Sequence, residues 1–462
     1  MMVFILSWDN SQDSKMFSSF TGVSKFGRRR IAAAVPAVKV LELDATLYSS
    51  GAWEDQTANN NDATLAGTPR HVVGSGAYFD LVPGDGDYFT IADQAALDSM
   101  TEISVLMWIN IDSVNAAGPN MLYSKRGTTS DGYVGFFTTT GWTFRFGTGT
   151  GTGLTYGTAP TTNVWQQVVV TIGATGSKMY INDAEVASSG YTGTSGNVNT
   201  AAALDLFEVN PRPQSGPVKM NGKVGIFKIY NGVLTLAEVQ AEYNTYKDRF
   251  IVTNGLQLYL QPKAYSGSGT SWTDSSDNTY TTTLVGAPTY NTTYFNFPNT
   301  TSRYVDTNQS LASEEFSVGL WFRTSAAGIK MTICKETVSG YPWNYRIWLN
   351  GGSIAADTAN SAGAYESIGS PLSTYNNGNW YLVMFTRNSS NLRLYVNGSE
   401  VANGAASLAT VSNSQEVWIG RSAFSGAYQW VGDFGETFIY NRVLTSTEIL
   451  QNFNATKGTY GL

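Results

Sequence analysis

The sequence KMYINDAEV at residues 178–186 returns as RLYVNGSEV at residues 393–401. In each copy a basic residue and β-forming side chains precede Asn-Asp or Asn-Gly, and a Glu-Val pair follows. Asn, Asp and Gly tolerate the positive φ angles of a tight two-residue turn, so both copies predict a β-hairpin. Trp165 and Trp380 stand upstream of the two hairpins, and each opens a mostly apolar strand.

The repeat extends over most of the chain. Trp53-x-Asp55 matches Trp272-x-Asp274, and further matches are Ser104-Val105-x-x-Trp108 with Ser317-Val318-x-x-Trp321 and Tyr230-Asn231-x-Val233-Leu234-Thr235-x-x-Glu238 with Tyr440-Asn441-x-Val443-Leu444-Thr445-x-x-Glu448. The offset between copies stays between 210 and 219 residues. Such a period is too long for a solenoid repeat and predicts two whole domains.

These matches divide the chain into four segments. We expect an N-terminal arm at residues 1–38, a first domain at 39–248, a short linker at 249–254 and a second domain at 255–462. The linker is apolar rather than rich in Gly and Ser, which predicts that the two domains touch.

The composition favours an all-β fold. Of the 462 residues only 14% are charged, 13% are aromatic and 47 are glycine. Short β-forming segments alternate with turn signals, and Thr-x-x-Glu at Thr235 and Thr445 is a capping box that predicts one short helix near the end of each domain. We therefore predict two tandem antiparallel jelly-roll β-sandwiches with an extended N-terminal arm.

Charge and cysteine content exclude several classes of protein. The net charge of −7 argues against nucleic acid as the main partner. The single cysteine, Cys334, excludes an intramolecular disulfide and a cysteine-based zinc site, and we expect it to be a small buried side chain. No apolar run approaches the roughly 18 residues of a membrane helix.

The ordered set of motifs resembles the concanavalin A-like jelly rolls, in particular the laminin G-like branch. The resemblance rests on the Trp-x-Asp loop, the Ser-Val-x-x-Trp strand, the Tyr-x-Asn hairpin and the Tyr-Asn-x-Val-Leu-Thr-x-x-Glu segment of both copies. It implies two packed antiparallel sheets, one of them concave, that bind glycans or proteins and mostly lack catalysis. Tandem copies with an N-terminal arm are similar to proteins of virus particles and to microbial surface adhesins.

Some relatives in that family are glycoside hydrolases with two carboxylates on one face of a strand, about 5 Å apart. The nearest approach here is Glu42-Leu43-Asp44, with Tyr48 in the region of the third carboxylate. Glu314 and Glu315 are adjacent and would point to opposite faces of a strand. His71 is the only histidine and no Gly-x-Ser-x-Gly elbow accompanies it, so we expect no enzyme.

Calcium is the one metal that the sequence raises, and no other cofactor is expected. Loop carboxylates can bind it, and the candidates are Asp85 with Asp87 and Asp274 with Asp277. The alternative is a set of ordinary turns, since Asp-Gly and Asp-Asn form turns without any metal. We favour the turns.

Glycan binding requires exposed aromatic rings beside polar groups. The second domain offers Tyr341, Trp343 and Tyr345, and also Tyr428 and Trp430. The first domain offers Tyr133 and Trp142. Aromatics within strands, such as Trp108 and Trp321, are expected in the core.

The arm differs in composition from both domains. Apolar and basic residues that could dock on an assembly are Phe17, Phe20, Lys25, Phe26, Arg28, Arg29 and Arg30. The alternative is an arm that folds back on its own domain.

Two hypotheses for function follow. The first is a non-catalytic structural or attachment protein of a virus particle (capsid decoration, fibre or minor component), located in the virion. It would be anchored through residues 1–38 to other structural proteins and would display its lectin-like domains toward host glycans. The second is a soluble or cell-surface lectin or adhesin, extracellular in location. A glycoside hydrolase is disfavoured because the carboxylate pair is missing.

Overall fold

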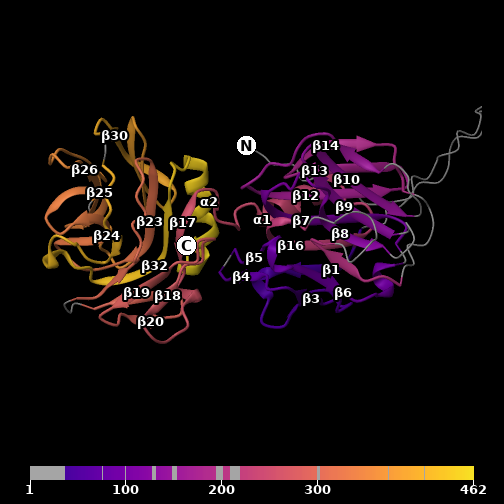
Figure 1. The fold of residues 1–462 in the computed structure, drawn as a ribbon, viewed down its shortest axis with the longest axis horizontal. Coiled ribbons are helices and arrows are strands. Elements are labelled where there is room, and N and C mark those ends of the chain that lie inside the picture. Colours follow the sequence, from indigo (N-terminus) through magenta and orange to yellow (C-terminus); the bar gives the residue numbers. More distant parts are fainter. Residues whose placement is uncertain are drawn as a thin grey trace, which may run out of the picture. The chain divides into compact units, whose positions relative to one another are not determined.

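The computed structural model describes residues 37–74, 76–98, 100–126, 132–147, 153–193, 201–208, 219–298, 302–372, 374–409 and 411–462. These residues fold into two β-sandwiches, indigo to magenta and orange to yellow in Figure 1. The predicted all-β class and the two tandem antiparallel sandwiches are confirmed. The proposed assembly residues of the arm lie outside the described residues: Phe17, Phe20, Lys25, Phe26, Arg28, Arg29 and Arg30.

Two eight-stranded antiparallel sheets form the first sandwich. Sheet A has the order β14 (Ala184–Ser189), β13 (Gly176–Ile181), β12 (Trp165–Gly173), β7 (Ile103–Ser113), β16 (Asn221–Asn231), β5 (Tyr78–Leu81) and β4 (Arg70–Val72), with β1 (Val38–Asp44) also paired to β16. Sheet B has the order β11 (Leu154–Tyr156), β10 (Gly141–Gly147), β9 (Gly132–Thr138), β8 (Asn120–Arg126), β15 (Leu204–Leu206), β6 (Tyr88–Ile91), β3 (Ala63–Ala66) and β2 (Ala52–Trp53).

The second sandwich repeats this plan. Sheet C has the order β20 (Thr289–Asn291), β21 (Tyr294–Phe297), β32 (Gly432–Tyr440), β23 (Phe316–Arg323), β28 (Trp380–Arg387), β29 (Asn391–Val396) and β30 (Ser399–Ala405), with β17 (Leu256–Leu260) also paired to β32. Sheet D has the order β18 (Ser271–Thr273), β19 (Thr281–Val285), β22 (Tyr304–Asp306), β31 (Trp418–Ile419), β24 (Ile329–Thr337), β25 (Gly340–Asn350), β26 (Ser353–Ala359) and β27 (Tyr365–Gly369). Strand for strand, sheet C corresponds to sheet A and sheet D to sheet B.

The repeated hairpins have the predicted turns. Asn182 and Asn397 adopt φ angles of 58° and 50°, the left-handed region that Asn tolerates. Each Asn side chain also holds the neighbouring strand, because its Oδ1 accepts a hydrogen bond from the backbone N–H of Gln167 (3.1 Å) or Leu382 (3.0 Å). The Asn of the repeat therefore joins the hairpin to the strand that begins at Trp165 or Trp380.

The charged residues of the repeat pair across the hairpin. Lys178 Nζ lies 2.8 Å from Glu185 Oε2 in the first copy, and Arg393 Nη1 lies 2.7 Å from Glu400 Oε2 in the second. Both pairs are exposed, so solvent and salt screen them and each contributes little to stability. They explain why a basic residue and a Glu recur at fixed spacing.

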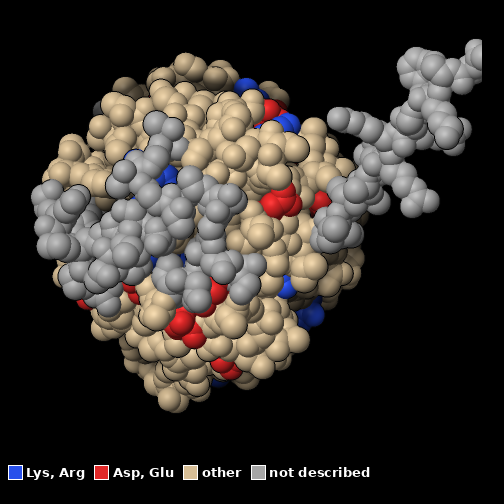
Figure 2. Space-filling model, turned by 90° about the vertical axis from the view of Figure 1, so that its right-hand side faces the viewer, with Lys and Arg blue, Asp and Glu red and all other residues tan. Residues whose placement is uncertain are grey.

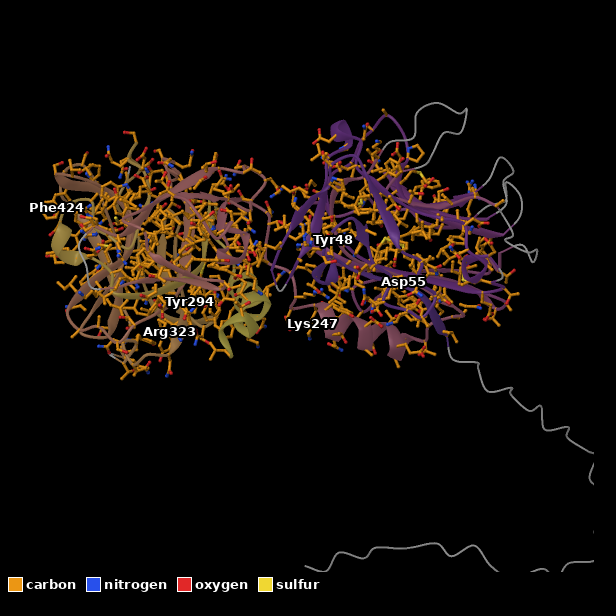
Figure 3. All side chains as sticks on the ribbon, turned by 90° about the horizontal axis from the view of Figure 1, so that it is seen from below. Tyr48, Asp55, Lys247, Tyr294, Arg323 and Phe424 are labelled. Atoms are coloured by element: carbon orange, nitrogen blue, oxygen red, sulfur yellow. The ribbon has the colours of Figure 1, made fainter. Side chains whose placement is uncertain are left out.

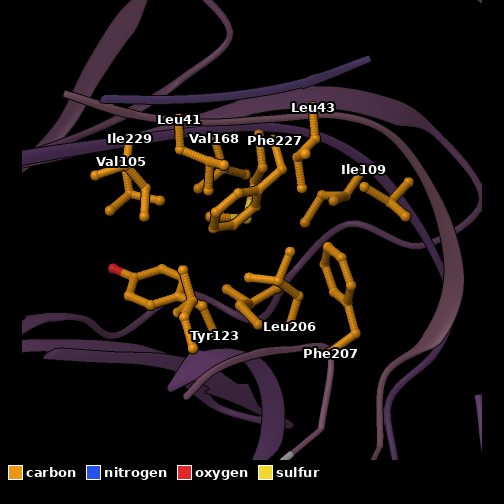
Figure 4. Close-up of a cluster of buried hydrophobic side chains, with 14 of the residues drawn as sticks. Leu41, Leu43, Val105, Ile109, Tyr123, Val168, Leu206, Phe207, Phe227 and Ile229 are labelled. Atoms are coloured by element: carbon orange, nitrogen blue, oxygen red, sulfur yellow. The ribbon is translucent and has the colours of Figure 1, made fainter. Parts of the chain in front are cut away.

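The core of each sandwich lies between its two sheets. In Figure 4 side chains of sheet A, such as Leu43, Ile109 and Phe227, face Tyr123 and Leu206 of sheet B. All five side chains are at most 2% exposed. The second sandwich has an equivalent core between sheets C and D.

One helix near the end of each sandwich packs on the outer face of a sheet. α1 (Leu236–Tyr246) begins at Thr235 and α2 (Ser446–Lys457) at Thr445, each with the predicted capping box. Trp108 of sheet A stacks on Tyr243 of α1, and Trp321 of sheet C stacks on Phe453 of α2. The two described helices thus lie on the outer faces of sheets A and C, and neither of them lies on sheet B or sheet D.

Charged side chains are sparse on the surface. On the face in Figure 2 small groups of acidic and basic residues interrupt a mostly uncharged surface. Neither described helix is long and apolar enough to cross a membrane.

Candidate functional site

The candidate site lies on the outer face of sheet D, which points away from the core of the second sandwich. Along β25, Tyr345, Ile347 and Leu349 point into the sandwich and are at most 1% exposed. Because side chains alternate along a strand, Arg346 and Trp348 point outward. On the neighbouring strand β24 a register shift between Met331 and Ile333 keeps Met331 opposite Trp348 on that outer face.

An irregularity in β25 places Trp343 on the outer face as well. Simple alternation would place Trp343 on the same face as Tyr345, but the pairing of β25 with β26 shifts between Trp343 and Arg346. The Arg346 guanidinium carbon lies 3.5 Å from the centre of the Trp343 ring, and the Tyr341 ring stacks at 4.5 Å from the same ring. Trp343 is therefore enclosed between Tyr341 and Arg346 and is only 5% exposed.

Buried carboxylates fix the guanidinium of Arg346. Asp357 of β26 stands opposite Arg346 and accepts hydrogen bonds from its Nε (2.7 Å) and Nη2 (3.1 Å), and also from Trp348 Nε1 (3.0 Å). Glu336 Oε2 lies 3.5 Å from Arg346 Nη1. Burial alone would lower the pKa of Arg346, but the hydrogen bonds and charges of Asp357 and Glu336 raise it above its ordinary value.

A loop after β31 completes the site and is tied to β24. Glu336 Oε1 accepts hydrogen bonds from Ser422 Oγ and from the backbone N–H of Phe424 (3.2 Å). Cys334 Sγ donates to the carbonyl oxygen of Arg421 at 3.2 Å. These contacts hold Phe424 at the periphery of the second sandwich, where it is 56% exposed (Figure 3). Cys334 is buried as expected, and burial raises the pKa of its thiol.

Together these groups enclose a pocket of about 330 Å³ on the outer face of sheet D, which we name the outer pocket. Its aromatic wall consists of Tyr341, Trp343, Trp348, Phe424 and Tyr428. Its remaining lining is Ile329, Met331, Ser339 and Arg346. A volume of this size with an aromatic lining is typical of small-ligand sites.

The outer pocket contains three of the predicted glycan-binding residues, Tyr341, Trp343 and Tyr428. The other two candidates of the second domain do not reach it. Tyr345 and Trp430 are 0% exposed and pack in the core, where Trp430 stacks on Phe434 at 4.6 Å. Trp343 itself supports the wall rather than offering a free face, because both of its faces are covered.

Both candidates of the first domain are buried. Tyr133 in β9 and Trp142 in β10 are each 1% exposed and pack in the core of the first sandwich. The expectation of exposed loop aromatics is corrected here, because both residues lie in strands with their side chains toward the opposite sheet.

The strand pairing shows which residues of the first sandwich correspond to residues of the outer pocket. Lys125 pairs with Tyr133 in the first sandwich, and Lys335 pairs with Tyr345 in the second. Both lysines are 0% exposed. The positions that follow Tyr133 and Tyr345 can therefore be compared one by one.

The described residues of the first sandwich do not repeat the aromatic site. Counting from Tyr133 and from its pairing with β10, the positions of Arg346, Trp348 and Asp357 are held by Val134, Phe136 and Arg145. The Arg–Asp pair that orders the outer pocket is thus replaced by Val134 opposite Arg145. The two sandwiches share a fold, but their described residues at these three positions differ.

A second aromatic cluster lies on sheet C. The Arg323 guanidinium lies 5.1 Å from the ring centre of Tyr294 and 4.9 Å from that of Trp380, and it pairs with Asp433 at 2.7 Å (Figure 3). Arg323, Tyr294 and Trp380 are half-buried, and we name these three residues the Arg323 cluster. Since its rings already stack around a guanidinium, it is a less open platform than the outer pocket.

Two of the calcium candidates bind backbone groups. Asp87 accepts hydrogen bonds from the N–H groups of Thr68 (2.7 Å) and Val82 (2.9 Å). Asp274 accepts from the N–H of Tyr259 at 2.7 Å, and its counterpart Asp55 accepts in the same way from the N–H of Glu42 at 2.9 Å. The repeated Trp-x-Asp motif therefore fastens a loop to the first strand of each sandwich.

The remaining two candidates are exposed. Asp277 pairs with Arg70 (3.0 Å) and Lys223 (3.1 Å), and Asp85 lies in a short 3-10 helix, Pro83–Asp85. Among the described residues no group of three or more His, Cys, Asp or Glu side chains could hold a metal ion. These contacts fit the interpretation of all four residues as parts of loops and turns.

The carboxylates considered for hydrolysis have structural partners. Glu42 pairs with Lys39 (2.7 Å) and Lys228 (3.0 Å), and Glu314 accepts from the N–H of Val411 (3.0 Å). Asp44 accepts from Thr46 and pairs with Arg249. His71 lies in β4, its Nε2 is 2.8 Å from the carbonyl oxygen of Ala45, and burial lowers its pKa.

The sequence motifs did not predict six residues of the outer pocket: Ile329, Met331, Ser339, Arg346, Trp348 and Phe424. The alternation of Arg346 and Trp348 with Tyr345, Ile347 and Leu349 indicates an outward-facing pair, and this signal was present in the sequence. Phe424 gave no such signal, because its position depends on contacts between its loop and Glu336.

Sequence comparison now gives the family. The profile of the concanavalin A-like lectin/glucanase superfamily matches residues 83–240 and, separately, residues 291–450. The chain belongs to this superfamily. The resemblance seen in the motifs is therefore confirmed, with one match in each sandwich. No curated protein matches the chain.

Solved structures with similar folds come from several proteins. The binding domain of Paraclostridial Mosquitocidal Protein 1 is 11% identical, with a TM-score of 0.41, over 83% of this chain and 97% of that one. Domain 4 of AbnA, an extracellular arabinanase from Geobacillus stearothermophilus in complex with arabinotriose, is 17% identical with a TM-score of 0.36, over 44% and 98% of the two chains.

The receptor-binding domain of a botulinum neurotoxin C/D mosaic serotype is 14% identical, with a TM-score of 0.35, over 44% of this chain. This chain spans about half (51%) of the length of that neurotoxin domain. At such identities and scores the likeness says nothing about ligands.

Proposed function

We propose that this chain is a non-catalytic glycan-binding protein, a lectin or adhesin that acts outside the cell or at a surface, and that the outer pocket is its binding site. The observation that carries the proposal is the pair of open aromatic rings at the pocket. Tyr341 is 43% and Phe424 is 56% exposed, and both stand beside a volume of about 330 Å³. Flat apolar rings with a polar edge suit the C–H faces of sugars.

The way the pocket is built also supports this proposal. Exposure of large aromatic side chains to water is unfavourable, so their retention here indicates a function. Tyr341 stacks on Trp343, which the paired guanidinium of Arg346 supports, and the backbone of Phe424 is tied to Glu336. Such a rigid arrangement lowers the entropy lost when a ligand binds. Membership of a superfamily that contains lectins agrees with the same function.

Replacement of both open rings tests the proposal. We expect the variant Tyr341→Ala/Phe424→Ala to lose glycan binding by about 30-fold or more, because each stacked ring contributes about 1 kcal/mol or more. A glycan array would first identify a ligand for the full chain, and titration calorimetry would then compare the variants.

Tyr365→Ala is the matched control, since Tyr365 is 63% exposed on β27 of the same sheet but does not line the pocket. Binding by the control at the level of the parent chain, with a melting temperature unchanged in both variants, supports the site. Equal losses in both variants, or no loss in the double variant, would contradict it.

A finer proposal is that the lectin is a virus-particle protein anchored by its arm. Its support is the contrast in composition between the arm and the rest of the chain. We expect the chain 36–462 to keep its fold and to lose assembly. This variant retains Ala37, which packs on a buried cluster of the first sandwich, and the whole of β1.

Light scattering on the full chain beside 36–462 measures the difference. Higher oligomers of the full chain alone support the anchoring role. Identical monomers would remove it, and the lectin proposal would stand on its own.

A further inference from the structure

The outer pocket is poor in groups that could recognise a charged ligand. Among the described residues that line it, Arg346 is the only cation. Its Nε and Nη2 are both engaged by Asp357, and its plane covers Trp343 at 3.5 Å. A carboxylate on a ligand would have to displace these contacts before it could pair with Arg346.

The charge balance behind the wall also disfavours anions. Asp357 and Glu336 are 3% and 2% exposed, and both lie within 3.5 Å of the single guanidinium. Two buried carboxylates beside one cation leave no surplus positive charge at the pocket. A neutral ligand is therefore favoured over an acidic one.

One side of the pocket is aliphatic. Ile329 and Met331 of β24 line it beside Trp348. Ile329 offers no hydrogen-bonding group and the Met331 thioether is only a weak acceptor, so a sugar hydroxyl pressed against them would lose its water without an equivalent replacement. A methyl group in the same place would instead gain from burial.

We propose, on the basis of the glycan-binding function proposed above, that the outer pocket selects neutral sugars that carry a methyl group absent from the parent hexose. Two kinds of sugar present this chemistry, the 6-deoxyhexoses and the N-acetylhexosamines. In either case the ring stacks on the open aromatic rings and the methyl group lies against Ile329 and Met331. Acidic sugars are disfavoured because Arg346 is already paired.

Matched sugars test this selectivity on the full chain by titration calorimetry. The pairs are N-acetylglucosamine against glucose and L-fucose against L-galactose, with glucuronic acid against glucose as the acidic comparison. We expect at least one methyl-bearing sugar to bind about ten-fold or more tightly than its parent, and glucuronic acid to bind no more tightly than glucose. Which of the two pairs shows the effect distinguishes the deoxy from the acetamido source.

The variant Ile329→Ser reports on the aliphatic side. Ile329 is half-buried at the start of β24, and its replacement is expected to bring the ratio of methyl-bearing to parent affinity close to one. Parent hexoses that bind as tightly as or more tightly than their methyl-bearing partners in both pairs, or glucuronic acid that binds more tightly than glucose, would overturn the selectivity and leave the glycan-binding proposal intact. No binding of any sugar, here or on a glycan array, would overturn both.

Discussion

Replacing Glu436 with glutamine will remove a large part of the pH dependence of the unfolding free energy between about pH 5 and pH 8. Glu436 of β32 is 3% exposed on the helix-covered face of sheet C, and its Oε2 accepts no hydrogen bond from the described residues. Burial raises its pKa from 4.5 to about 8, and Lys263 and Tyr259 offset only part of that effect.

The sign of the effect follows from proton binding. Below pH 4.5 the carboxyl group is protonated in both the folded and the unfolded chain. Between pH 4.5 and about 8 the folded chain keeps the proton while the unfolded chain releases it, so stability falls as the pH rises. The full loss is about 5 kcal/mol, since each unit of pKa shift corresponds to about 1.4 kcal/mol.

Urea unfolding of the parent chain and of Glu436→Gln at pH 5 and at pH 8.5 measures this effect. The two chains should be similar at pH 5, and the glutamine variant should be the more stable by several kcal/mol at pH 8.5, roughly. Glu315→Gln, an exposed position of the same sandwich, is the control and should run parallel to the parent chain. Parallel curves for Glu436→Gln as well would show that Glu436 is not held neutral.

Replacing Asp357 with asparagine will both destabilise the second sandwich and weaken ligand binding. Asp357 receives three hydrogen bonds, two from Arg346 and one from Trp348. An amide has one acceptor oxygen, and its NH₂ group would face N–H donors. Breaking a buried ion pair in this way costs about 3 kcal/mol or more. Binding should fall about ten-fold or more, because Arg346 would no longer be held on Trp343.

Denaturant unfolding and calorimetry on the same samples measure both effects. Glu400→Gln is the matched control, because it breaks the exposed Arg393–Glu400 pair of the same sandwich and should cost no more than about 0.5 kcal/mol. If Asp357→Asn lost binding but kept its stability, Asp357 would contact the ligand directly. If the variant kept both its stability and its ligand binding, Asp357 would not be the residue that positions Arg346.

Much of the fold could be predicted because the chain contains it twice. The hairpins at Asn182 and Asn397 and the helix caps at Thr235 and Thr445 depend on residues within a few positions of one another, and the structure confirms them. Local interactions of this kind can be predicted from a sequence.

Burial on both faces of a strand was harder to predict. Apolar residues at every second position of β7 are typical of a strand with one buried face, but all of its first nine residues are buried. One face packs against sheet B and the other lies under α1 and Phe250, so Trp108 is buried outside the sandwich core. Which helix covers which sheet depends on tertiary packing, which the strand pattern does not contain.

The outer pocket could be predicted only in part, because its residues also depend on tertiary packing. Tyr341, Trp343 and Tyr428 line the outer pocket, and Trp343 does so because the register shift in β25 moves it away from the inward face that Tyr345 occupies. A single irregularity moves a side chain from one face of the sheet to the other. Phe424 joins the pocket through a loop contact to a residue far away in the sequence.

The most direct measurement is a crystal structure of the full chain soaked with N-acetylglucosamine. The account predicts the sugar ring in the outer pocket, stacked on Tyr341 or Phe424, with its acetamido methyl group against Ile329 and Met331. A sugar bound instead at the Arg323 cluster, or on the outer face of sheet B at Phe136, would contradict the assignment of the binding site.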